Sequence, residues 1–186
     1  MRDFAATPEP RGGRVRAKSG AGGNPRFVVQ QHDATRMHWD FRLEIDGVLV
    51  SWAVPKGPSL DPSQRRLAVQ TEDHPIEYGT FEGVIPEGHY GAGPVLLWDR
   101  GYWLPEGDPT EGLRRGRLTF ALAGEKLRGT FSLVRMSDAP PGPKSNWLLI
   151  KRSDEYSKPR SDVVAEQPRS VDTGRDLTEI EAAWRE

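Results

Sequence analysis

Residues 37–45 read MHWDFRLEI, in which apolar and polar side chains alternate without a break. Every odd position is apolar and every even position is polar, which is the period of two that a β-strand produces. One face of this strand is therefore predicted to pack in a core. The other face carries His38, Asp40 and Arg42, an unusual set for a face that would simply meet solvent.

Short strand-like segments recur along the chain and predict an all-β fold. The sequence has 20 Gly and 16 Pro, and its apolar residues make up 35% of the chain in short runs, as expected for strands joined by turns. Asp46-Gly47 predicts a tight two-residue hairpin. Eight candidate strands suit a closed barrel or a sandwich, and the segments are 26–31, 36–45, 48–54, 66–71, 93–98, 117–123, 126–134 and 146–152.

The chain divides into three regions by composition. Residues 1–24 are rich in Gly and basic side chains and predict a flexible arm, residues 25–156 the barrel domain, and residues 157–186 a polar tail. Leu177, Ile180 and Trp184 form an i, i+3, i+7 stripe, which predicts a short C-terminal helix that docks on the barrel. A helix that binds a partner is the alternative.

Overall composition limits the chemistry and the compartment. The chain has no cysteine, so a metal would be held by His, Asp or Glu. The net charge of -1 shows that the chain is not a generally basic nucleic-acid coat, so any phosphate site must come from local clustering of basic residues. No apolar run approaches the length of a membrane span, so we expect a cytoplasmic protein without membrane contact.

The polar face of residues 37–45 predicts a metal site. His38 and Asp40 are two positions apart and can reach one ion, and His32 lies a short turn upstream. Two imidazoles and one carboxylate suit Mn, Fe or Zn and leave coordination positions for water and substrate. Arg42, next on the same face, could hold a phosphate beside the metal. The alternative is an amphipathic strand whose polar face is solvated.

Other candidate side chains give weaker signals. Lys56, Arg66, His74 and Tyr78 are residue types that hold phosphate or transfer protons. Each also has an ordinary structural explanation. Lys56 and Arg66 could be surface charges, His74 a hydrogen-bonded loop residue and Tyr78 an amphipathic wall residue. His89 lies in a Gly-rich turn that lacks phosphate-loop spacing, so we interpret that turn as structural.

Several blocks of sequence resemble the 3'-phosphoesterase domain of bacterial ATP-dependent DNA ligase D. The resemblance runs in order over roughly residues 1–155. Its blocks are HDATRMHWDFRLE (32–44), SWAVPKGP (51–58), RLAV (66–69), EDHP (72–75), FEG (81–83), IPEG (85–88), YGAG (90–93) and WLLIK (147–151).

This resemblance implies a closed β-barrel of about eight strands with a polar crevice that holds Mn²⁺. It implies removal of 3'-terminal ribonucleosides and 3'-phosphates from DNA primer-template 3' ends, which leaves a 3'-hydroxyl for ligation in non-homologous end joining. The implied metal ligands are His32, His38 and Asp40. The implied catalytic groups are His74, Arg42, Tyr78, Arg66, Lys56 and Glu82, and the implied substrate-binding residues of the arm are Arg2, Asp3 and Glu9.

The sequence shows no polymerase or adenylating ligase domain, so we expect either a stand-alone form or a part of a larger ligase. We expect a monomer, and a separate DNA ligase or polymerase and an end-binding protein are candidate partners. Two rival interpretations remain. A non-haem Fe(II) dioxygenase would use His38, Asp40 and a distant His74 or His89, and an inactive DNA-end-binding module would retain the site without turnover.

Overall fold

The computed structural model describes residues 23–136 and 140–186, and the proposed arm residues Arg2, Asp3 and Glu9 lie outside them. Most of the regular structure is β, as predicted. The strands are β1 (Arg26–Asp33), β2 (Met37–Ile45), β3 (Val48–Val54), β4 (Arg65–Gln70), β5 (His74–Pro75), β6 (Gly83–Ile85), β7 (Gly93–Pro105), β8 (Arg117–Gly124), β9 (Arg128–Arg135) and β10 (Asn146–Lys151). The helices are η1 (Ile76–Thr80, a 3-10 helix), α1 (Pro109–Arg115), α2 (Val163–Glu166) and α3 (Leu177–Arg185).

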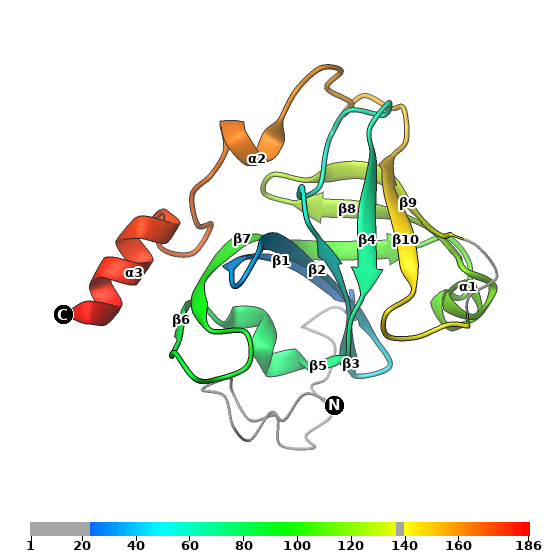
Figure 1. The fold of residues 1–186 in the computed structure, drawn as a ribbon. Coiled ribbons are helices and arrows are strands. Elements are labelled where there is room, and N and C mark those ends of the chain that lie inside the picture. Colours follow the sequence, from blue (N-terminus) through cyan, green and yellow to red (C-terminus); the bar gives the residue numbers. More distant parts are fainter. Residues whose placement is uncertain (1–22, 137–139) are drawn as a thin grey trace.

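Eight strands form a closed antiparallel barrel (Figure 1). Their order is β1-β2-β3-β4-β10-β9-β8-β7, and β7 pairs back with β1, which closes the sheet. The predicted barrel is therefore confirmed. The hairpin between β2 and β3 is also confirmed, since Asp46 and Gly47 both have positive φ, at 50° and 81°, as a type I′ turn requires.

The barrel interior is an aromatic core. Odd positions of β2, such as Phe41 and Leu43, point into it, and Phe41 lies 6.1 Å from Phe120 between ring centroids. Trp52 and Trp147 meet edge to face at 5.7 Å. This interior occupies one face of β1–β3, so any polar site on these strands must lie on their outer face.

The outer face of β1–β3 is covered by the connection from β4 to β7, which contains β5, η1 and β6. β5 pairs with β3, and β6 pairs with β7. The Gln30 side chain donates hydrogen bonds to the carbonyl oxygens of Tyr78 and Phe81, at 2.8 and 3.0 Å, and so ties this connection to β1. The polar face of β2 is consequently buried: Asp40 is 7% exposed and Arg42 1%.

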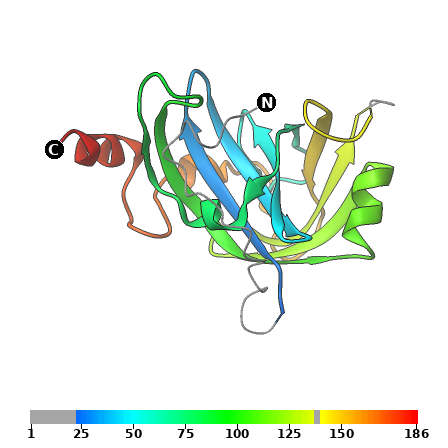
Figure 2. The ribbon, with the colours of Figure 1, turned by 90° about the horizontal axis from the view of Figure 1, so that it is seen from below.

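The C-terminal tail packs along the barrel and ends in the predicted helix. Val163 in α2 and Ile180 in α3 are buried in the main apolar cluster, and the indole N–H of Trp98 donates to the carbonyl of Gln167 at 2.8 Å. Trp184 is 56% exposed, so the stripe is buried only in its first part. Figures 1 and 2 show α3 and α1 at opposite ends of the molecule. Within the described residues, no helix has the length and apolar character needed to cross a membrane.

Candidate metal centre and cleft

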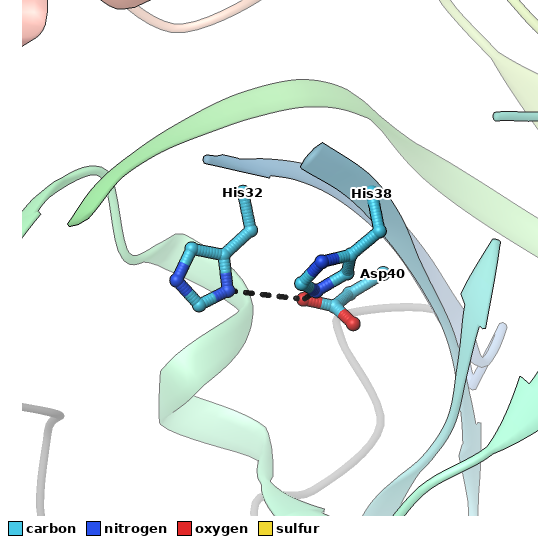
Figure 3. Close-up of side chains that lie close together, drawn as sticks. All are labelled: His32, His38 and Asp40. Carbon is cyan, nitrogen blue, oxygen red and sulfur yellow. Dashed lines mark hydrogen bonds and ion pairs between the residues drawn. The ribbon is translucent and has the colours of Figure 1, made fainter. Parts of the chain in front are cut away.

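His32, His38 and Asp40 lie together on the outer face of β1 and β2 (Figure 3). His32 on β1 pairs directly with His38 on β2, and Asp40 follows on the same face. Each side chain offers one ligand atom, and these atoms all lie within 4.8 Å of one another. The strand register therefore brings together the three residues that the sequence proposed as metal ligands.

The outward nitrogen of each imidazole is held by a backbone carbonyl. Nε2 of His32 lies 2.6 Å from the oxygen of Gly91, and Nδ1 of His38 lies 3.0 Å from the oxygen of Arg36. Because a carbonyl only accepts, each of these nitrogens carries the proton. The lone pairs of His32 Nδ1 and His38 Nε2 therefore point inward, as in histidines that bind metals.

The inward atoms meet one carboxylate oxygen. Asp40 Oδ2 lies 3.2 Å from His38 Nε2 and 3.7 Å from His32 Nδ1. Because both outward N–H groups are already engaged, the three inward atoms that face one small space are all hydrogen-bond acceptors. A cation satisfies them, either a proton on His38 or a metal ion. As metal ligands, two imidazoles and one carboxylate fit a divalent transition metal.

Electrostatics of the cluster follow from this geometry. Burial alone would raise the pKa of Asp40, but the charge of Arg42 and the contacts with both histidines hold it well below its usual value. Burial alone would lower the pKa of His38, but the hydrogen bond and charge of Asp40 raise it above 6.5. Asp40 is therefore an anion at neutral pH, ready to act as a ligand.

Arg42 is a fully buried cation that connects the cluster to His74. Its Nη2 lies 3.5 Å from Asp40 Oδ2, and its Nη1 lies 2.9 Å from Ser51 Oγ and 3.0 Å from His74 Nδ1. Its Nε donates to Gln30 Oε1 at 2.7 Å. Most of the guanidinium is thus engaged within the protein, and Nη2 is the nitrogen directed toward the cluster.

His74 adjoins both Arg42 and the backbone of Glu72. Its Nδ1 lies 3.0 Å from Arg42 Nη1, which can only donate, and 2.9 Å from the carbonyl oxygen of Glu72, which can only accept. Nδ1 therefore has a partner in either tautomer of the ring. Tyr78 lies behind this pair, 4.9 Å from His74 between ring centroids and 4.9 Å beneath the Arg42 guanidinium.

The cluster lies in a cleft of about 590 Å³. Its lining comes from β1–β4 and from the loops around them. The lining residues are His32, Ala34, Thr35, Arg36, His38, Asp40, Ala53, Val69, Gln70, Thr71, Glu72, His74, Tyr90, Gly91, Pro143 and Lys144. A metal-ligand set at an open cleft is the arrangement of a catalytic site, because substrate can reach the ion.

Residues 30–135, which carry the whole cluster, match the family model for the DNA Ligase D 3'-phosphoesterase domain. The chain belongs to this family. Similar proteins include the multifunctional non-homologous end joining protein LigD of Pseudomonas aeruginosa, 55% identical over 178 residues, which are 95% of this chain and 21% of that protein. The corresponding DNA repair protein of Mycobacterium tuberculosis is 49% identical over 138 residues, 73% of this chain and 17% of that protein. The chain thus spans about a fifth of the length of the curated relatives it matches.

Three other predicted catalytic residues of this phosphoesterase-family chain, Arg66, Lys56 and Glu82, have contacts of their own. Arg66 donates from Nη1 to the backbone oxygen of Lys56 at 3.2 Å, and the Lys56 side chain is exposed. Glu82 accepts from the backbone N–H of Leu97 at 2.8 Å and from the Thr173 hydroxyl at 2.6 Å. Their catalytic roles stay predictions.

Other cleft residues were missed by sequence reasoning. Gly91, from the turn interpreted as structural, supplies the carbonyl that orients His32. Glu72, Arg36, Tyr90 and Lys144 line the cleft from separate loops. Loop positions carry no periodicity that would have revealed them, although the charge of Arg36, two residues before His38, was a usable signal.

Proposed function

We propose that the chain is a divalent-metal-dependent 3'-phosphoesterase. It removes 3'-terminal ribonucleosides and 3'-phosphates from the primer strand of DNA ends and leaves a 3'-hydroxyl. The observation that carries this proposal is the convergence of two imidazole lone pairs and one carboxylate oxygen in an open cleft of a chain from this family. The names of the relatives place them in non-homologous end joining, and we propose the same setting here, with a DNA ligase and an end-binding protein as partners.

The residues that would hold the ion are His32 through Nδ1, His38 through Nε2 and Asp40 through Oδ2. When bound, an ion such as Mn²⁺ would act as a Lewis acid toward a phosphate oxygen and offset its charge. Gly91 and Arg36 fix the two rings by accepting from their outward nitrogens, and this orientation strengthens their inward donation.

Arg42 and His74 would act on the phosphate side of the cluster. Arg42 keeps Asp40 ionised and directs Nη2 toward the cluster, where it supplies positive charge to a bound phosphate. Its Nη1 lies 3.0 Å from His74 Nδ1 and so holds His74 beside the cluster. His74 would stabilise a phosphate oxygen or donate a proton to the leaving oxygen, and the attacking group would be water or the ribose 2'-hydroxyl.

The test is incubation of the pure chain and Mn²⁺ with a labelled primer-template that ends in one ribonucleotide. We expect conversion through a 3'-phosphate to a 3'-hydroxyl, seen by gel and by phosphate release. Asp40→Asn should lose this activity, whereas Glu106→Gln, which removes an exposed carboxylate outside the cleft lining, should retain it. An untouched primer would overturn the proposal.

The nucleophile is tested with a primer whose terminal ribonucleotide is replaced by a deoxyribonucleotide. Removal of the terminal nucleoside at an unchanged rate would exclude attack by the 2'-hydroxyl. Loss of that removal, together with continued hydrolysis of a 3'-phosphate end, would support it.

A further inference from the structure

Three exposed side chains on the cleft wall have no part in the proposed chemistry. Arg36 comes from the turn between β1 and β2, Tyr90 from the loop between β6 and β7, and Lys144 from the loop between β9 and β10. They are far apart in sequence, and the closed barrel brings their loops to one cleft. All three are exposed, with Tyr90 at 70%.

The strand register gives the direction of the cleft across the barrel. Asp40 on β2 pairs with Ala53 on β3, Ala53 with Val69 on β4, and Val69 with Asn146 on β10, two residues after Lys144. Three strand spacings of ~4.8 Å separate β2 from β10, or about 14 Å. Lys144 therefore lies on the far side of the cleft from Asp40, where its charge is placed for a further group of an extended ligand.

The two cations are unpaired within the part of the chain that the structure describes. Neither Arg36 nor Lys144 forms an ion pair with another described residue, whereas Arg100, Arg114 and Lys151 each contact a carboxylate. Lys144 also has φ of 74°, a left-handed conformation that is unfavourable for a non-glycine residue. Its backbone N–H donates to the oxygen of Gln70 at 2.7 Å, which fixes the lysine at the wall. Strain of this kind concentrates at functional sites.

We propose that the cleft is a binding groove for the primer strand upstream of its 3' end. Arg36 and Lys144 bind internucleotide phosphates, and the ring of Tyr90 stacks on a base. A groove with cations along the backbone path and an aromatic platform is the pattern of sequence-independent single-strand binding. This inference rests on the proposed function, because it takes the reacting 3' end to lie at the metal cluster.

The test measures affinity without cleavage. A fluorescent primer-template with a short single-stranded 3' end is titrated with the full chain in chelator, and anisotropy is followed at several salt concentrations. The double variant Arg36→Gln with Lys144→Gln should weaken binding about tenfold at low salt, and should reduce the slope of log affinity against log salt by about 1.4, or 0.7 for each phosphate lost. The matched control is Arg117→Gln with Lys158→Gln, which removes two exposed charges outside the cleft lining and should stay within twofold of the parent chain.

Tyr90 is tested in the same assay. Tyr90→Ala should weaken binding about fivefold or more, while Tyr90→Phe, which keeps the ring, should bind like the parent chain. Equal affinities of Tyr90→Ala and the parent chain would show that Tyr90 does not contribute to DNA binding in the groove.

Activity separates this proposal from the one on which it rests. In the presence of Mn²⁺, the double variant should show a raised KM for the primer-template and an unchanged kcat, because the metal cluster is intact. A parent chain that binds DNA through Arg36 and Lys144 but never cleaves would contradict the phosphoesterase function alone. Cleavage by the parent with unchanged affinity and KM in the double variant would contradict the groove alone.

Discussion

Asp40 is the residue on which the charges of the cluster converge. It accepts from His38 and lies within 3.7 Å of His32 and 3.5 Å of Arg42. In the metal-free chain, Asp40 raises the pKa of His38, and a metal ion would compete with the proton for this ring. Metal affinity should therefore fall as the pH decreases through the pKa of His38.

The pKa of His38 can be measured directly. In the metal-free chain, an NMR titration of its ring protons should give a midpoint above 6.5, because the hydrogen bond and charge of Asp40 outweigh burial. Since the folded-state pKa is raised, this contact stabilises the fold fully below pH 6.5, and the contribution is lost as the pH rises through the folded-state pKa.

The control for this titration is Asp40→Asn. Burial and the charge of Arg42 then act without the carboxylate, so the midpoint should fall below 6.5. A midpoint that does not change on this substitution would show that Asp40 and His38 are not coupled as described.

The sequence predicted the residues of the metal site in part. The period of two placed His38, Asp40 and Arg42 on one face, and His32 was close enough in sequence to join them. The same period could not show that Arg42 would be buried and engaged with Gln30, Ser51 and His74, because those partners come from other strands. Glu82 was carried over from the family resemblance, and in the structure it accepts from the backbone N–H of Leu97.

Backbone atoms of the β6–β7 loop and of the first residue of β7 support the metal site. Gly91 accepts from His32, and Gly93, with φ of 134°, lies so close to β1 that an added Cβ would be 1.9 Å from the carbonyl oxygen of Asp33. Gly93→Ala should therefore destabilise the fold by about 2–4 kcal/mol in urea unfolding and should weaken metal binding, since Asp33 adjoins His32.

The matched control lies in the loop between β6 and β7. Gly88 has φ of 85°, but its added Cβ would have nothing within 4 Å. Gly88→Ala should cost only the conformational strain, about 1 kcal/mol, and should leave metal affinity unchanged. Equal effects of the two substitutions would argue against the close approach of Gly93 to β1.

The tail contributes to stability through its first apolar positions. Ile180 is 4% exposed in the main cluster, whereas Trp184 is 56% exposed. Ile180→Ala should lower the free energy of unfolding by about 2–4 kcal/mol. Trp184→Ala should change it by less than about 0.5 kcal/mol. Chemical denaturation followed by circular dichroism measures both, and a larger effect at Trp184 would contradict the packing of α3.

The sequence predicted the long elements better than the short ones. All eight predicted strands exist, because apolar alternation and turn residues fix them locally. β5, η1 and β6 were not predicted, since strands of two and three residues exist only through their pairing with β3 and β7. α1 was missed as well, although Asp108 caps it and Gly116 ends it in a left-handed conformation.

In the molecule as a whole, β1–β3 separate two environments. Their inner face packs in the aromatic barrel core, and their outer face carries the polar network beneath the β5–β6 connection. The packed barrel core supports the geometry of the polar network. Neither the closure of β7 onto β1 nor the position of this connection could be predicted from local pattern, because both depend on which distant strands pair.

We propose that His32, His38 and Asp40 bind the metal ion that hydrolysis of a DNA 3' end requires. A Mn²⁺ titration of chelator-treated protein with a primer-template that ends in a 3'-phosphate, followed by phosphate release, tests this proposal. We expect no release without metal, recovery with one bound ion per chain, and no recovery in the variant that combines His32→Gln with Asp40→Asn. Release in the absence of metal, or full recovery in that variant, would contradict it.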